Sequence, residues 1–460
     1  MTVARAHDPP VWIPTDFTLI FRGQGTPESP KFQVVRNSPN DVDLPLQILQ
    51  RMYTEISKCR ISGSTNLVQI LSLGEQELTG VFPESKDQVI TKGPVDMVWC
   101  PDSGLVQLKQ SYSLDEMYGD NYGYRSALNQ GMVAHLNNKV SSLLRKIPTK
   151  AGDIILDIGS NDATSLKFYP SHLRRIGIDP TGLKFKEYYP ADIALVPDFF
   201  TAANFRKIFP NEQAKIVTSI AMFYDLENPL QFAADIASVL AEDGVWHFEQ
   251  SYLASMLRTN SYDTICQEHL EYYSLLSVKY ILDQCGLRFL DIEMNDVNGG
   301  SFAVTVCKKD AKYPKNDALI NWMLEEEEKM GLNTIEPYRQ FAERVAAHKM
   351  SLLSLLDKLK AEGKKIVGYG ASTKGNVLLQ YCGIDTKYLD CIAEVNEQKF
   401  GSYTPGTLIP IVSEAEALAM KPDYMLVLPW HFRNGILQRE REFRASGGKF
   451  IFPLPFIEIV

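Results

Sequence analysis

The side chains best suited to acid–base chemistry lie in SYDTICQEHLEYYS, residues 261–274. Histidine has a reference pKa of about 6.5, so His269 suits a general base near neutral pH. The adjacent Glu268 is a carboxylate that can orient an imidazole or stabilise its protonated form. Gln267 interrupts a His-x-His pattern, and no other His or Cys spacing here is typical of a metal site. The stretch therefore predicts a proton-transfer site.

A second group of polar residues follows the apolar run ILDI in ILDIGSNDATSLKFY. Asp157 and Gly159 stand where strand 154–158 ends, and Asp179 ends the next strand, 22 residues after Asp157. Ligands of open α/β sheets bind at this edge, and an acidic residue there suits a ribose diol. The further candidate contacts are Asn161, Asp162, Asp198 and Phe199. A single glycine favours a nucleoside without a pyrophosphate, such as S-adenosylmethionine, although Asp157 also fits a plain strand-end turn.

A third motif, GYGASTKGN at residues 368–376, follows the strand KKIV and opens a helix. Main-chain N–H groups, Ser372 and Lys374 form a candidate anion site at this helix start. The motif is not a Walker loop, because Lys374 precedes Gly375 without the GK[ST] order. A plain glycine turn is the structural alternative.

Composition limits the function classes. The chain has 460 residues, 45% of them hydrophobic, and a formal net charge of −9, so a broad cationic surface for nucleic acid is not expected. No run approaches the roughly 18 apolar residues of a membrane span, and the N-terminus lacks a signal-like apolar region. Seven scattered cysteines, an odd number, favour reduced thiols. We expect a cytoplasmic protein with a small-molecule ligand.

The elements that position these motifs predict an α/β chain of several units. Residues 1–55 read as an irregular extension that ends in a helix over LPLQILQRMYTEI, and 56–115 as a small β-rich module. Strands and helices alternate in 116–310 as in a parallel sheet. Residues 311–362 predict a helical linker, with EEEE at 325–328 as a solvated face. A second, smaller α/β domain spans 363–460.

The motifs LDIGSND, HFEQSYL, YDTIxxEHxxYY and GYGASTKGN together resemble the S-adenosylmethionine-dependent C-methyltransferases of nucleotide-activated deoxysugars, over about residues 59–460. The resemblance implies a small zinc module, a central class I methyltransferase domain with a Rossmann-like seven-stranded sheet, and a C-terminal Rossmann-like domain that holds the nucleotide sugar. It also implies methylation of the carbon next to the ketone of a 4-keto sugar. A base first removes the proton there, and His269 matches that base.

The resemblance assigns roles to further residues. His269, Glu268 and Tyr122 form the expected catalytic group, in which tyrosine hydroxyls donate to the developing enolate oxygen. The expected substrate contacts are Tyr124, Tyr224, Tyr369, Ser372, Lys374, Asn376, Glu394 and Arg433. Glu394 suits a ribose hydroxyl and Arg433 a phosphate, while Tyr369 and Trp430 suit either base stacking or packing. Cys266, Gln267 and Tyr224 depart from relatives that carry Tyr, His and His at these places.

The zinc module departs from the family pattern. Its two expected C-x-x-C pairs read Cys59-Arg-Ile-Ser62 and Cys100-Pro-Asp-Ser103. Serine hydroxyls are weak zinc ligands at neutral pH, so we expect no zinc.

Two other functions stay open at this stage. The second glycine turn also fits a dinucleotide, which would make the chain an NAD-dependent oxidoreductase of nucleotide sugars. The lost zinc ligands also fit a non-catalytic ligand-binding scaffold. The expected partner is a small nucleotide-sugar substrate, with no nucleic acid and no membrane, and the expected state is a monomer.

Overall fold

The structure is a computed structural model that describes residues 17–19, 34–36, 53–113, 117 and 125–460. The chain divides into two compact units, Met1–Arg51 and Met52–Val460. In the first unit, β1 (Phe17–Leu19) pairs antiparallel with β2 (Val34–Arg36). Most of the predicted N-terminal extension lies outside the described residues.

A seven-stranded sheet forms the centre of the second unit, in the order β10-β9-β8-β11-β12-β15-β14. Its strands are β10 (Ile193–Val196), β9 (Arg174–Ile178), β8 (Ile154–Ile158), β11 (Ala214–Ile220), β12 (Leu240–Ser251), β15 (Ser301–Lys308) and β14 (Leu287–Asn295). All neighbours are parallel except β15, which runs antiparallel to both of its neighbours. The prediction of a seven-stranded α/β sheet is confirmed.

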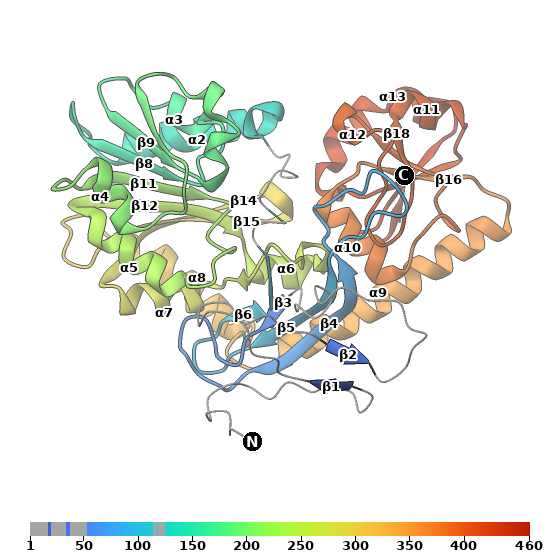
Figure 1. The fold of residues 1–460 in the computed structure, drawn as a ribbon, viewed down its shortest axis with the longest axis horizontal. Helices are drawn as coiled ribbons and strands as arrows, with labels where there is room; N and C mark the ends of the chain where they lie inside the picture. Colours follow the sequence, from blue (N-terminus) through green and yellow to red (C-terminus); the bar gives the residue numbers. More distant parts are fainter. Residues whose placement is uncertain (1–16, 20–33, 37–52, 114–116, 118–124) are drawn as a thin grey trace. The chain divides into compact units, whose positions relative to one another are not determined.

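Helices cover both faces of this sheet, which is why its strands read as continuous apolar runs. Figure 1 shows α2 (Gln130–Lys146) and α3 (Thr164–Lys167) on one side, and α5 (Pro229–Val239) and α7 (Leu275–Gln284) on the other. Alternate residues of β8 accordingly enter different cores: Ile155 packs with α2, whereas Leu156 belongs to the larger cluster that contains α5. The carboxyl ends of the parallel strands stay free for a ligand.

A smaller sheet, in the order β13-β6-β5-β4, forms the β-rich module. Its strands are β4 (Val68–Glu77), β5 (Lys92–Trp99), β6 (Val106–Leu108) and, from far along the chain, β13 (Glu271–Tyr272). Beside it, β3 (Tyr53–Glu55) pairs with β7 (Gln110–Tyr112). The helix predicted over LPLQILQRMYTEI is therefore wrong at 53–55. Pairing with a distant strand prevailed over local periodicity, and Tyr and Thr suit strands well.

Two helices form the expected linker, α8 (Asp317–Lys329) and α9 (Glu336–Ala361). The prediction that EEEE is a solvated face is wrong for Glu327, which is 1% exposed. Its carboxylate accepts hydrogen bonds from the Tyr252 hydroxyl at 2.7 Å and from the backbone N–H groups of Leu275 and Leu276. Glu327 therefore satisfies the free N–H groups at the start of α7.

The C-terminal domain is built on a six-stranded sheet in the order β18-β17-β16-β19-β20-β21. Its strands are β16 (Ile366–Tyr369), β17 (Ile392–Glu394), β18 (Ile411–Ser413), β19 (Tyr424–Val427), β20 (Lys449–Phe452) and the antiparallel β21 (Glu458–Ile459). After β16, α10 (Thr373–Cys382) follows the glycine turn, and α11 (Glu414–Ala419) and α12 (Arg433–Arg439) lie later in the domain.

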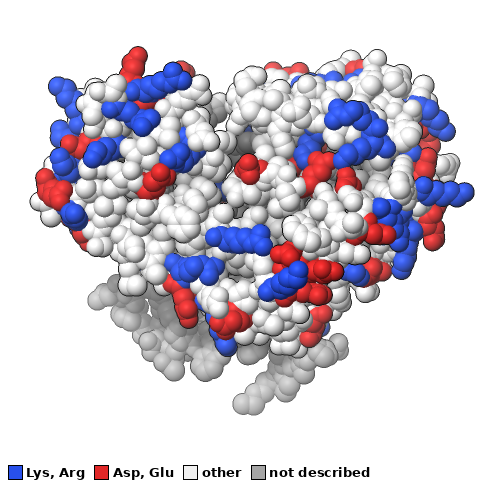
Figure 2. Space-filling view, turned by 180° about the vertical axis from the view of Figure 1, so that it is seen from behind, with Lys and Arg blue, Asp and Glu red and all other residues white. Residues whose placement is uncertain are grey.

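Within the described part of the chain, every helix is too short or too polar to cross a membrane. Basic and acidic side chains are interspersed on the face drawn in Figure 2.

Candidate active site

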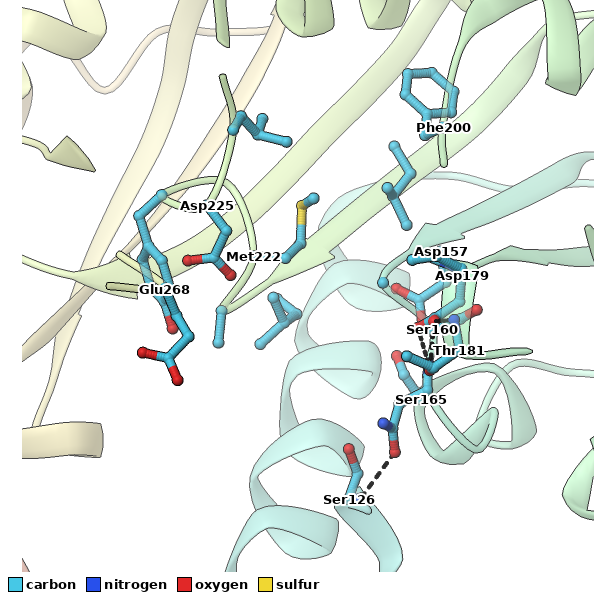
Figure 3. A pocket seen from close by; sticks show the side chains of 18 of the residues that line it. Ser126, Asp157, Ser160, Ser165, Asp179, Thr181, Phe200, Met222, Asp225 and Glu268 are labelled. Carbon is cyan, nitrogen blue, oxygen red and sulfur yellow. Dashed lines mark hydrogen bonds between the residues drawn. The ribbon is translucent and has the colours of Figure 1, made fainter. Parts of the chain in front are cut away.

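A cavity of about 500 Å³ opens at the carboxyl ends of the central strands. Its lining includes the turns after β8, β9, β10 and β11, residues of α2 and α5, the segment 266–269 and the first turn of α10. Figure 3 shows Glu268 and Asp225 at one end and Asp157, Asp179, Ser160 and Thr181 at the other, with Met222 between them. The cavity therefore joins the predicted nucleoside site to the predicted base.

The glycine turn after β8 is held close to the neighbouring strand. Gly159 has a φ of +70°, and its N–H donates to the Ile178 carbonyl at 2.9 Å. A Cβ at this position would lie 3.1 Å from Cγ of Met222. Both the positive φ and the contact favour glycine, which leaves the backbone open toward the cavity.

Two buried acids face this turn. Asp179 accepts hydrogen bonds from the Asn161 N–H at 2.8 Å and from the Thr181 N–H at 2.6 Å, which fixes its carboxylate. Asp157 accepts from the Thr218 hydroxyl, and burial raises its pKa to about 7. Carboxylates beside an open glycine turn fit the ribose hydroxyls and the positive sulfonium of S-adenosylmethionine.

His269 is held in the form that a general base requires. Its Nδ1 lies 2.8 Å from the Thr264 carbonyl, which only accepts, so Nδ1 carries the proton and Nε2 keeps its lone pair. Burial lowers the pKa of His269 to about 4, so the ring is neutral at pH 7. The Tyr224 ring packs edge-on against it, with centroids 4.3 Å apart.

Glu268 lies next to the base but does not orient it through a described hydrogen bond. Burial raises the pKa of its carboxyl, and the Thr79 hydroxyl donates to it at 3.5 Å. Gly80 makes room for it, since a Cβ there would lie 2.5 Å from Oε1 of Glu268. The Thr264 carbonyl, for which the sequence carries no signal, fixes the imidazole instead.

The segment Ser261–Tyr273, here called the base loop, is anchored to distant parts of the chain. The Gln267 side chain accepts from Thr79 N–H at 3.4 Å and donates to the carbonyls of Gln76 and Glu77. Gln267 is therefore a fully buried structural contact to the end of β4.

The C-terminal half of the chain holds the start of the same loop. The Trp430 indole N–H donates to Asp263 at 2.8 Å. The Tyr262 hydroxyl donates to Nδ1 of His348 at 3.0 Å, because the other nitrogen of that ring donates to the Pro453 carbonyl. The base loop is thus positioned jointly by α9 and the C-terminal domain.

The end of the base loop is part of the β-rich module. Glu271 and Tyr272 form β13, which pairs with β6. Arg60, inside the first Cys-x-x-Ser turn, lies 3.6 Å from the Glu271 carboxylate and donates to the Leu108 carbonyl. Burial raises the pKa of Glu271 well above its usual range, and the charge of Arg60 opposes that shift. The module therefore supports the end of the base loop.

The four residues at the expected zinc ligand positions do come together in space. Sγ of Cys59 lies 3.3 Å from Oγ of Ser103, and Oγ of Ser62 lies 3.6 Å from Sγ of Cys100. Two thiols and two hydroxyls that hydrogen-bond to each other in pairs do not fit a structural zinc ion, for which thiolate or imidazole ligands are usual. Across the described ranges, no group of three or more His, Cys, Asp or Glu side chains is placed to bind a metal. The absence of zinc stays a prediction.

The cavity brings together many of the residues predicted from sequence. Those that line it are Asp157, Gly159, Asn161, Asp179, Phe199, Tyr224, Glu268, His269 and Lys374. Tyr122 and Tyr124 lie outside the described residues, so their predicted roles stay predictions.

The other predicted contacts lie outside the cavity lining. Asp198 accepts from Nδ2 of Asn204, and Arg433 pairs with Glu458 at 2.8 Å. The Tyr369 hydroxyl donates to Glu440 at 2.9 Å.

Three further predicted residues make structural contacts at or just after the second glycine turn. Ser372 caps α10, the Asn376 amide donates to the Thr79 carbonyl at 2.8 Å, and Glu394 accepts from the Ala371 N–H at 2.7 Å. Their roles toward a ligand stay predictions.

Several lining residues were missed, among them Asp225, Met222 and Thr373. Asp225 and Met222 follow β11, so the rule that ligands bind at the carboxyl ends of parallel strands was a signal for both. Thr373 lies inside the GYGASTKGN motif, which was its signal for a ligand, but its place in this cavity depends on how the C-terminal domain packs.

Comparisons with known proteins agree with this geometry. Three family models match in order along the chain: "Putative zinc binding domain" over 59–118, "Methyltransferase domain" over 132–292 and "C-methyltransferase C-terminal domain" over 296–455. The C-methyltransferase NovU of Streptomyces niveus is 30% identical over 411 residues, which cover 88% of this chain and 97% of NovU.

Solved structures match at much lower similarity. The N-methyltransferase NodS of Bradyrhizobium japonicum is 15% identical over 38% of this chain and 87% of NodS, with a TM-score of 0.28. The magnesium protoporphyrin IX methyltransferase of Synechocystis is 10% identical over 39% of this chain and 80% of that chain, with a TM-score of 0.30. TM-scores this low carry no structural argument.

Proposed function

We propose, from the premise that this chain belongs to the S-adenosylmethionine-dependent C-methyltransferases, that its acceptor is a nucleotide-linked 4-keto-deoxysugar. The methyl group is added to the carbon next to the ketone. One observation supports this most strongly: the nucleoside turn and a neutral histidine line the same cavity.

The residues that would hold the methyl donor are those of the first glycine turn and its acids, namely Asp157, Gly159, Asn161, Asp179 and Phe199. S-adenosylmethionine, when bound, supplies an electrophilic methyl group. The buried carboxylates balance the positive charge of the donor, and the half-exposed ring of Phe199 offers an apolar surface to its adenine. Asp198 is proposed only to support this side of the donor site, because it accepts a hydrogen bond from the Asn204 side chain.

His269 is the proposed base. Its neutral Nε2 takes the proton from the carbon next to the ketone, which is a weak acid, and Nδ1–H stays bound to the Thr264 carbonyl. Because the imidazole cannot rotate without losing that bond, the lone pair keeps one direction. Tyr224 limits the space beside the ring and is proposed to contact the sugar.

The nucleotide end of the substrate is proposed to lie against the C-terminal domain. The support is a second glycine turn with an acid at the end of the next strand, Glu394, which is suited to a ribose hydroxyl. The start of α10 offers N–H groups to a phosphate. All seven cysteines are free, as in reducing compartments, so we place the reaction in the cytoplasm and treat the chain as acting alone.

A substrate screen tests this function. Purified protein is incubated with S-adenosylmethionine and a panel of nucleotide 4-keto-sugars, and product mass and NMR locate any new methyl group. One substrate is expected to gain a single methyl group on the carbon next to the ketone. Methylation on oxygen or nitrogen would contradict the proposal, and so would reduction of the sugar by NADH without methylation.

His269→Ala is the matching variant. Turnover is expected to fall by about 100- to 10,000-fold, the usual range for loss of a general base, while S-adenosylmethionine still binds. The control is His172→Ala, since His172 is exposed and lies outside the cavity lining. Near-normal turnover of His269→Ala would remove the proposed base.

A further inference from the structure

Lys374, at the start of α10, lines the cavity that contains the proposed base. Among the described residues that line the cavity, it is the one Lys or Arg. It lies in the first turn of α10, half-buried, in the cavity that also contains His269 and Glu268. Its position brings a cation from the C-terminal domain to the proton-transfer site.

The helix itself gains nothing from this cation. Ser372 already caps α10 by accepting from the Gly375 N–H at 3.0 Å. The start of a helix carries partial positive charge, so an ammonium group in the first turn is disfavoured there. Burial lowers the pKa of Lys374 further, although the negative charge of Asp263 opposes this.

The groups around Lys374 connect it to the base loop. Asp263 is 1% exposed, and one of its oxygens accepts from the Trp430 indole. The charge of Lys374 acts against the burial that raises the pKa of Asp263. The same charge adds to the burial that lowers the pKa of His269 and of His431, and Lys374 and His269 line one cavity.

We propose that Lys374 is a catalytic residue that stabilises the enolate oxygen formed when His269 removes the proton, an inference that rests on the proposed function. Nε2 of His269 takes the proton, and the electron pair of the C–H bond becomes the carbon–carbon double bond. The former carbonyl pair moves onto oxygen, where the Lys374 ammonium donates a hydrogen bond. When the carbon takes the methyl group, the methyl–sulfur bond breaks and its electron pair stays with S-adenosylhomocysteine, the carbonyl reforms, and the proton on His269 passes to solvent.

A role for Lys374 as a ligand of the diphosphate is the alternative. Four carboxyl groups share the cavity lining with it: Asp157, Asp179, Asp225 and Glu268. A diphosphate can be held by the main-chain N–H groups at the start of α10 without the lysine side chain, whereas the enolate forms beside His269 and needs a cation there. The lining therefore favours the enolate.

Lys374→Met tests the assignment, with the nucleotide keto-sugar that gives turnover in the screen. Methionine keeps much of the side-chain volume and removes the charge. We expect kcat to fall by about 100- to 1,000-fold, the effect of losing one oxyanion donor, with KM for the sugar changed less than threefold. Binding of the free nucleoside diphosphate and of S-adenosylmethionine, measured by calorimetry, is expected to stay unchanged. Lys374→Arg should restore part of kcat.

Lys387→Met is the matched control, because Lys387 is an exposed lysine of the same domain. A Lys374→Met variant with normal kcat, or one whose main defect is a raised KM with weaker diphosphate binding, would overturn the assignment and leave the C-methyltransferase function intact. Wild-type protein that methylates no keto-sugar would instead overturn the proposed function together with this inference. Retained S-adenosylmethionine binding in each variant shows that a loss of kcat is not a loss of fold.

Discussion

Two glycine turns, one in each α/β domain, share a backbone design. The N–H of Gly159 donates to Ile178 at 2.9 Å, and that of Gly370 donates to Ala393 at 2.8 Å, so each glycine is tied to the neighbouring strand. Their φ angles are +70° and +82°. In both sheets the turn follows the first strand of the sheet in chain order, which lies between the second and the fourth strands.

The acids that end the neighbouring strands are also held alike. Asp179 accepts the Asn161 N–H at 2.8 Å, and Glu394 accepts the Ala371 N–H at 2.7 Å. The surroundings differ. The first turn opens directly into the cavity, whereas the second contributes only Thr373 and Lys374 to it. Lys399 donates to the Ala371 carbonyl beside the second turn.

The difference shows that turn geometry fixes how an acid is held but not which ligand it meets. A ligand site also needs space, and the packing of other elements around the turn decides that. Here the first turn supplies the proposed cofactor edge, and the second supplies a lysine to the same cavity.

Exchanging each acid for its amide should separate the two turns. Asp179→Asn is expected to weaken S-adenosylmethionine binding by about 10- to 100-fold, since hydrogen bonds to a charged group contribute about 1.5–3 kcal/mol. Glu394→Gln is expected to weaken nucleoside diphosphate binding by a similar factor. Calorimetry with both ligands on both variants checks this. If both variants lose the same ligand, the two turns do not have separate roles.

Alanine at the two glycines tests the role of the surroundings. A left-handed backbone costs a non-glycine residue about 1–2 kcal/mol at either site. A Cβ at Gly370 would also lie 2.7 Å from the rigid ring of Pro429, whereas one at Gly159 would meet only the flexible Met222. Thermal unfolding should therefore show the larger loss for Gly370→Ala, and S-adenosylmethionine affinity the larger loss for Gly159→Ala. A larger stability loss in Gly159→Ala together with a larger affinity loss in Gly370→Ala would contradict the proposed difference between the two turns.

We expect Asp157, at the first glycine turn, to cause the pH dependence of S-adenosylmethionine binding. Burial raises the pKa of Asp157 to about 7, from an ordinary value of 3.8. The folded protein keeps this proton while the unfolded chain loses it, so this group lowers stability as pH rises from about 4 to 7. Ionisation near pH 7 in turn favours the positive donor. Affinity for S-adenosylmethionine should rise between pH 6 and 8, and Asp157→Asn should abolish the rise. If the affinity of Asp157→Asn still rises between pH 6 and 8, a different group causes the pH dependence.

The smallest effect is expected at the former zinc ligand positions. Protein purified without added metal should contain no zinc, and Ser62→Cys with Ser103→Cys should bind one equivalent, because the four side chains already lie together. Turnover should change little, since Arg60 and β13 support the base loop without metal. Elemental analysis settles both points, with Ser62→Cys alone as the control. One tightly bound equivalent in the wild type would contradict the prediction.

The sequence predicted most of the sheets, because buried parallel strands read as apolar runs such as ILDI at 155–158. It failed where distant pairing decides the structure. Tyr53–Glu55 continues a helical pattern but pairs with β7. Glu327 belongs to a run of four acids yet binds the start of α7.

The site could likewise be predicted from sequence only where its residues carry local signals. Asp157, Gly159, Asp179 and His269 carry local signals, and the structure places them around one cavity. The contacts of Gln267 with β4 were not predictable, because they join residues about 190 positions apart. Tyr369 and Arg433 had suitable chemistry, but their partners are protein groups whose proximity only the fold reveals.

Proton removal before methyl transfer is the central claim, and solvent exchange measures it directly. The wild-type protein is incubated with the nucleotide keto-sugar in heavy water, with S-adenosylhomocysteine in place of the methyl donor, and NMR follows the hydrogen on the carbon next to the ketone. We predict that deuterium enters at that carbon alone and that His269→Ala stops the enzyme-dependent exchange. Exchange at the wild-type rate in His269→Ala would contradict the account.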